Sequence, residues 1–167
     1  METELRWQKK WYESQYQLFL ENKQIGVISP IVFSSKTIAC SGGNKYIFRP
    51  SGLMLRKIQI IDADTKSRLG DICFSRLGTK ATINLNVEET YCLKCENVFI
   101  ARWTISRNQE ELINYSGNNT RGNIRTAIPH KLLLITGLYA SIFQWKKFVI
   151  FVTIFISLLV IFSRTIH

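Results

Sequence analysis

The sequence predicts a mainly β domain, built as an antiparallel meander and followed by a hydrophobic C-terminal tail. Short runs of alternating or β-branched residues, separated by turns of Asn, Gly, Asp and Lys, recur roughly every ten residues up to Tyr115. From Lys131 to His167 there is no Asp or Glu, and apolar residues run almost continuously. A series of short strands of this kind closes as a barrel or folds as a sandwich.

The N-terminal segment, residues 1–15, is aromatic and basic. Its rings and charges are interleaved, with Arg6, Trp7, Lys9, Lys10, Trp11 and Tyr12 in close succession. Trp7 and Trp11 stand four apart, which would place them on one face of a helix. Aromatic rings beside basic residues are typical of a membrane surface. The alternative is that these rings cap the core of the domain.

Residues 16–143 form the predicted domain, with about ten strands. Ala81–Val87 shows the pattern best, because its apolar and polar side chains alternate without a break. Ser116–Thr126 is expected to be a polar loop rich in Gly, Asn and Arg. The predicted strands are Tyr16–Leu20, Ile25–Ser29, Ser35–Cys40, Tyr46–Arg49, Leu53–Ile61, Leu69–Ser75, Ala81–Val87, Tyr91–Glu96, Phe99–Ile105 and Leu112–Tyr115.

Two apolar runs follow the strands. Lys131–Phe143 is too short to span a bilayer and has the length of a buried core helix. Within it, the small residues Gly137, Ala140 and Ser141 form a face that a neighbouring backbone can approach closely. We therefore expect this first run to pack inside the domain.

The second run, Phe148–Phe162, has no charged residue. As a helix it covers roughly 22 Å of a hydrocarbon core about 30 Å thick. Residues 144–167 are accordingly interpreted as a basic juxtamembrane linker and a transmembrane segment, and snorkelling lysine side chains can cover part of the shortfall. A second buried core helix is the alternative.

The net charge of +10 favours anionic partners such as phospholipid head groups, nucleic acid or acidic proteins. The body of the domain keeps +6 when the tail is left out. The adjacent hydrophobic helix favours lipid among these partners and makes nucleic acid the less expected one. The candidate head-group contacts are Arg121, Arg125, Lys131, Trp145, Lys146 and Lys147.

Residues 1–16 have no apolar core of signal-peptide length, which predicts a body that stays in the cytoplasm. The more basic flank of the membrane segment is its N-terminal one, and this bias places the same side in the cytoplasm. Cys40, Cys73, Cys92 and Cys95 are then expected to be reduced thiols.

No motif points to catalysis, a metal or a cofactor. Cys92 and Cys95 have metal-ligand spacing, but a structural zinc site needs four ligands and neither a second cysteine pair nor a nearby histidine pair completes one. Asp62 and Asp64 begin like a calcium loop, yet Ser67 stands where that loop requires glycine. We expect a protein that is not an enzyme.

The run of short strand–turn–strand units before a final apolar helix resembles the tubby-like superfamily, which includes tubby C-terminal domains, LURP-one-related proteins and phospholipid scramblases. The unit Leu53–Ser75, with an aspartate-rich turn, resembles a repeat of that fold. The resemblance covers about residues 16–143 and implies a closed twelve-stranded β-barrel around a central helix. Lys131–Phe143 would be that helix.

The predicted function is therefore that of a non-enzymatic, membrane-tethered module. Its basic surface would contact anionic phospholipid or a membrane protein. Phospholipid transport or scrambling is one alternative, and a nucleic-acid-binding module is a second.

Overall fold

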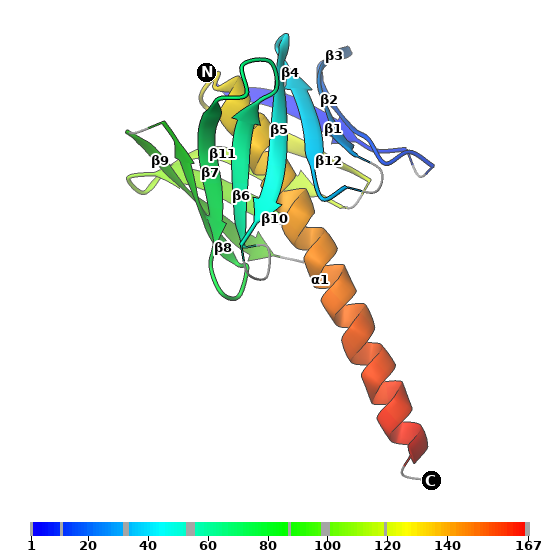
Figure 1. Ribbon diagram of the computed structural model, residues 1–167. Coiled ribbons are helices and arrows are strands. Elements are labelled where there is room, and N and C mark those ends of the chain that lie inside the picture. Colours follow the sequence, from blue (N-terminus) through cyan, green and yellow to red (C-terminus); the bar gives the residue numbers. More distant parts are fainter. Residues whose placement is uncertain are drawn as a thin grey trace.

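The structure, a computed structural model, is a closed antiparallel barrel of twelve strands with one long helix (Figure 1). It describes residues 2–10, 12–31, 34–52, 56–86, 88–97, 101–118 and 120–165, with side chains up to residue 163. The strands are β1 (Thr3–Gln8), β2 (Tyr16–Leu20), β3 (Lys23–Pro30), β4 (Thr37–Ser41), β5 (Asn44–Ser51), β6 (Lys57–Asp62), β7 (Arg68–Phe74), β8 (Lys80–Leu85), β9 (Glu89–Asn97), β10 (Arg102–Arg107), β11 (Glu110–Gly117) and β12 (Arg121–Thr126). They are followed by α1 (Lys131–Thr165). The predicted mainly β class and the closed barrel are confirmed.

Consecutive strands pair with one another, and β1 closes the barrel by pairing with both β2 and β12. Side chains along each strand alternate between the inside and the outside of the barrel. In β8 the side chains of Ala81, Ile83 and Leu85 are buried inside it, while those between them face outward. Predicted strand residues Leu53, Val87 and Phe99 lie outside the described residues.

The N-terminal segment is part of the barrel, which corrects its separation as residues 1–15. Leu5 and Trp7 of β1 are buried in the core, and polar residues alternate with them. This period of two is the pattern of a half-buried strand, so Trp7 does not lie on a helix. Trp11, its expected partner, lies outside the described residues.

The expected polar loop Ser116–Thr126 also contains a strand, β12. Gly122 and Asn123 have low strand propensity, but β12 is held between β1 and β11 and buries Ile124 and Thr126. The indole of Trp7 covers Gly122, where a larger residue would collide with it. With β1 and β12 the strand count is twelve, against the ten expected from the sequence.

The first half of α1 fills the barrel, as the small-residue face predicts. Tyr139 stacks on Phe48 with ring centroids 4.2 Å apart. Tyr115 of β11 donates a hydrogen bond from its hydroxyl to the Leu134 carbonyl at 2.9 Å. Gly137, Ala140 and Ser141 are all buried, and a Cβ at Gly137 would overlap the Tyr115 hydroxyl and the Ile105 side chain.

α1 does not break where it leaves the barrel. Residues 144–147 are helical, and the helix runs on to Thr165 as a stalk that projects from the barrel (Figure 1). Beyond Lys147 it extends about 27 Å. In the described part of the chain this is the one helix long and apolar enough to cross a membrane, and its most apolar stretch lies outside the barrel.

The barrel therefore has two distinct ends. The exit end, where α1 leaves, carries the connections β1–β2, β3–β4, β5–β6, β7–β8, β9–β10 and β11–β12. The far end carries the other connections and the start of α1. Two glycines show this directly: a Cβ on Gly78, between β7 and β8, would lie 2.9 Å from the Gln144 side chain, and one on Gly42 would lie 2.6 Å from that of Lys131.

Candidate functional site

Basic side chains are concentrated at the exit end of the barrel. In the described part of its connections, and at the first residue of each strand that follows, Glu13 is the one acidic residue, and it pairs with Lys10 at 3.1 Å. The far end, in contrast, mixes both signs and holds Glu21, Asp64, Glu88, Glu89 and Glu110. The basic residues of the exit end are Lys9, Lys10, Lys36, Arg56, Lys57, Arg76, Lys80, Arg102, Arg121, Lys146 and Lys147.

Lys146 and Lys9 meet over one aromatic ring at the helix exit. Their ammonium nitrogens lie 5.6 and 5.3 Å from the centroid of the Tyr16 ring, within cation–π range. Partial burial lowers the pKa of Lys146, and the charge of Lys9 lowers it further. Two like charges are thus held close together beside the emerging helix.

A similar convergence occurs around Lys147, the next residue of α1. The Lys147 ammonium lies 4.7 Å from the centroid of Phe143, the last ring of the inner helix. Burial lowers the pKa of Lys147, and the nearby charge of Arg56 lowers it further. An anion placed between these cations would relieve their repulsion.

A groove of about 430 Å³ lies between the exiting helix and the β7–β8 connection. Arg56, Arg76 and Lys147 line it together with apolar and aromatic side chains, and its described lining includes no acidic residue. The other lining residues are Phe74, Ser75, Leu77, Gly78, Thr79, Trp103, Gln144, Trp145, Phe148 and Phe151. The groove is therefore amphipathic, because cations and aromatic rings line the same space beside the helix exit.

The structure brings together four of the six predicted head-group contacts. Lys146, Lys147 and Trp145 lie where α1 leaves the barrel, and Arg121 begins β12 at the same end. Arg125 and Lys131 do not join them. Lys131 begins α1 beside Gly42 at the far end, about 22 Å along the helix from Lys146. Arg125 is the penultimate residue of β12, at the end of that strand nearer the far end of the barrel.

Several exit-end residues were not singled out from the sequence. Arg56, Arg76 and Leu77, which belong to two turns, are among them. Their position in the sequence carries a signal. In a meander every second turn lies at the same end of the sheet, so the charges of alternate turns can be summed and the two ends compared. That comparison needs the strand count, which was two strands short.

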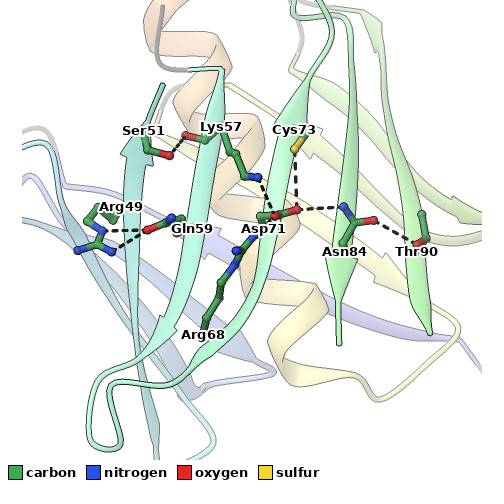
Figure 2. Close-up of polar contacts among 9 residues, drawn as sticks. All are labelled: Arg49, Ser51, Lys57, Gln59, Arg68, Asp71, Cys73, Asn84 and Thr90. Carbon is green, nitrogen blue, oxygen red and sulfur yellow. Dashed lines mark hydrogen bonds and ion pairs between the residues drawn. The ribbon is translucent and has the colours of Figure 1, made fainter. Parts of the chain in front are cut away.

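A second polar cluster lies on the outer face of the barrel, over β6, β7 and β8 (Figure 2). Asp71, only 7% exposed, is paired with Arg68 and with Lys57 at 3.3 Å, and it accepts a hydrogen bond from Asn84 at 2.9 Å. Burial opposes the charge of Asp71, but these partners together lower its pKa below the usual value. The carboxylate is thus fully engaged in tying neighbouring strands together.

The four cysteines are free thiols. In β9 the side chain of Cys92 is exposed, while that of Cys95 packs partly against the core. Burial raises the pKa of Cys95. Among the described residues, no three His, Cys, Asp or Glu side chains are grouped closely enough to hold a metal ion.

Comparison with known proteins yields a fold and no family. No protein-family model and no curated protein sequence matches the chain. An X-ray structure of a protein from Arabidopsis thaliana is similar, with a TM-score of 0.59 over 84% of this chain and 89% of that one. The two sequences are 11% identical, so this likeness concerns the fold alone.

Proposed function

We propose that this protein is a non-enzymatic module anchored in a membrane by the outer part of α1, with the exit end of its barrel resting on anionic phospholipid head groups. The observation that carries this proposal is the concentration of basic side chains around the point where α1 leaves the barrel. Basic residues next to a membrane segment gain up to about 1 kcal/mol each against an anionic leaflet.

The continuous helix supports the same arrangement. Because α1 has no break between Phe143 and Phe148, no flexible linker separates the barrel from the outer helix. The end of the barrel that surrounds the exit of α1 therefore faces the bilayer. The acidic residues of the far end, among them Glu88 and Glu89, are then held away from the anionic surface. The end of the barrel that faces the bilayer is therefore the basic end, as contact with an anionic surface requires.

The closed barrel around a helix is also the fold that the tubby-like resemblance implies. That superfamily includes proteins of membrane surfaces, and the agreement in architecture supports placing this chain among them as part of the proposal.

The test compares the full-length protein in lipid nanodiscs of phosphatidylcholine alone and of phosphatidylcholine with phosphatidylserine. Hydrogen exchange of the β7–β8 amides, residues 75–79, is expected to slow in the anionic discs, and high salt should abolish the difference. Lys36→Glu with Lys80→Glu should remove the effect. The matched pair Lys23→Glu with Lys45→Glu, at the far end, should leave it intact.

Equal exchange in both kinds of disc would contradict the proposed lipid contact. The alternatives have separate readouts. Transfer of labelled lipid between the leaflets of vesicles that contain the protein would favour scrambling. Salt-sensitive binding of an oligonucleotide to the disc-bound protein would favour nucleic acid.

A further inference from the structure

The groove beside the exiting helix has the features of a site for a single amphiphile. We propose that it holds one phospholipid molecule with an anionic head group, bound where α1 enters the bilayer. This inference rests on the proposed membrane anchoring and specifies a bound ligand at the same end of the barrel. The volume of the groove, about 430 Å³, lies within the usual range for small-molecule sites.

The polar part of the ligand is defined by the three cations of the groove. Arg56 and Arg76 come from two different turns, and Lys147 comes from the helix, so an anion among them would bridge three separate segments of the chain. The described lining has no carboxylate to neutralise these charges. A guanidinium offers paired N–H donors to phosphate oxygens. Arg56 and Arg76 are therefore suited to bind a phosphodiester.

The apolar part of the ligand is defined by other side chains that line the same groove. Leu77 is 86% exposed, and Phe151 is 67% exposed. Free phosphate would leave these side chains in water, whereas an acyl chain would cover them and gain about 25 cal/mol for each Å² of apolar surface buried.

Continuity with the helix favours a lipid over a protein occupant. The apolar wall of the groove passes through Phe148 and Phe151 directly into the exposed outer face of α1, where Ile154 and Phe155 follow. A chain lying against Phe151 therefore runs on along the helix in the direction of the bilayer interior. No change of surface chemistry separates the groove from the proposed transmembrane segment.

The experiment is native mass spectrometry of the full-length protein, released from a mild detergent and titrated with phosphatidylserine or phosphatidylcholine. One phosphatidylserine per chain is expected to bind at least tenfold more tightly than phosphatidylcholine. Arg56→Gln with Arg76→Gln should weaken phosphatidylserine binding roughly 30-fold, the factor for two charges that each contribute about 1 kcal/mol. Both arginines are exposed, so the variant should fold.

Two controls identify the site and the ligand. Lys23→Gln with Lys45→Gln removes the same charge at the far end and should leave binding within twofold of the wild type. sn-Glycerol 3-phosphate, which has the phosphate without the chains, should not displace the lipid, whereas Leu77→Gln should weaken binding through the apolar side alone.

Equal binding of the two lipids, or equal loss in the two double variants, would overturn the inference. So would displacement by sn-glycerol 3-phosphate, because the site would then recognise phosphate alone. These outcomes are separate from the exchange experiment above: exit-end amides protected by anionic discs, with no lipid retained in the groove, would leave the proposed function standing and refute the bound lipid.

Discussion

Gly137 is the residue on which the fit of the inner helix depends most directly. The helix passes so close to β10 and β11 that Tyr115 and Ile105 occupy the space a Cβ would need. The same tyrosine anchors the helix through its hydrogen bond to Leu134. A larger residue at 137 therefore disturbs both packing and a buried hydrogen bond.

Substitution of Gly137 should destabilise the protein. Gly137→Ala gains up to about 1 kcal/mol of helix propensity, but overpacking costs roughly 1–3 kcal/mol, so the net change is unfavourable. Gly137→Leu adds more atoms and should cost more. Thermal or urea unfolding of the detergent-solubilised protein, followed by near-ultraviolet circular dichroism, measures both changes.

The neighbouring residue supplies a control for this prediction. The Thr136 hydroxyl is buried and has no hydrogen-bond partner among the described residues. Thr136→Val keeps the shape and removes an unsatisfied group, so it should be neutral or stabilising by up to about 1 kcal/mol. A Gly137→Leu protein that melts with the wild type would mean that residue 137 is not enclosed by the barrel.

The residue pattern predicted the packed face of the inner helix better than it predicted the set of head-group contacts. Gly137, Ala140 and Ser141 could be assigned to a packed face because helical spacing is fixed by local geometry. The head-group set was harder: Lys131 and Lys146 look like one basic tail in the sequence, but the helix separates them by the length of the barrel. Only the placement of Lys131 beside Gly42 resolves that distinction.

Among the strands, β1 and β12 show why sequence alone predicted an incomplete barrel. β1 carries Glu4 and Arg6 beside Leu5 and Trp7, so its composition resembles that of a surface segment. β12 is rich in Gly and Asn, and it is a strand because β1 and β11 flank it. Closure is a long-range property, and pairing of the first strand with the last has no local signal.

The outer polar cluster lets the sheet be tested at the level of strand pairing. Asp71→Asn should lower the free energy of unfolding at neutral pH by about 1–3 kcal/mol, because hydrogen bonds and ion pairs of a charged group across β6, β7 and β8 are lost. Denaturant unfolding measures this loss. Asp64→Asn, in the exposed β6–β7 turn, removes the same charge and should change stability little.

The pH dependence of the same variant has a definite sign. Since the pKa of Asp71 is lowered on folding, its contribution is fully present above the unfolded value of about 4 and is lost as the pH falls through the folded value. The wild type should therefore lose more stability than Asp71→Asn on acidification below about pH 4. Parallel acid curves for the two proteins would show that the ion pairs contribute nothing.

For the whole molecule, the division of α1 into an inner and an outer part predicts membrane anchoring. The full-length protein should stay with membranes in alkaline carbonate. Deletion of residues 152–167 should release a folded, monomeric body, because the described side chains beyond Phe151 make no part of the core. Fractionation and size-exclusion chromatography check both. An aggregated or unfolded truncated body would instead place the outer helix in the core.

The charges that flank the outer helix predict the orientation of the protein in a membrane. Lys146 and Lys147 precede it and Arg164 follows it, and the more basic flank is retained in the cytoplasm. Protease added outside intact cells should leave the barrel whole. Lys146→Glu with Lys147→Glu should produce a mixed orientation, seen as partial digestion. Full digestion of the wild-type barrel would contradict the predicted topology.

The position of α1 after all twelve strands has a consequence for how the protein is made. During synthesis the strands emerge first, with the apolar inner faces of Phe48, Ile58 and Ile83 still uncovered. They cannot finish their core until the ribosome has delivered the helix that fills it. The same helix also carries the stretch that we propose as the membrane anchor. With the proposed anchoring, completion of the barrel and delivery to the membrane are therefore coupled in time, and until α1 has emerged the apolar inner faces of the strands stay uncovered.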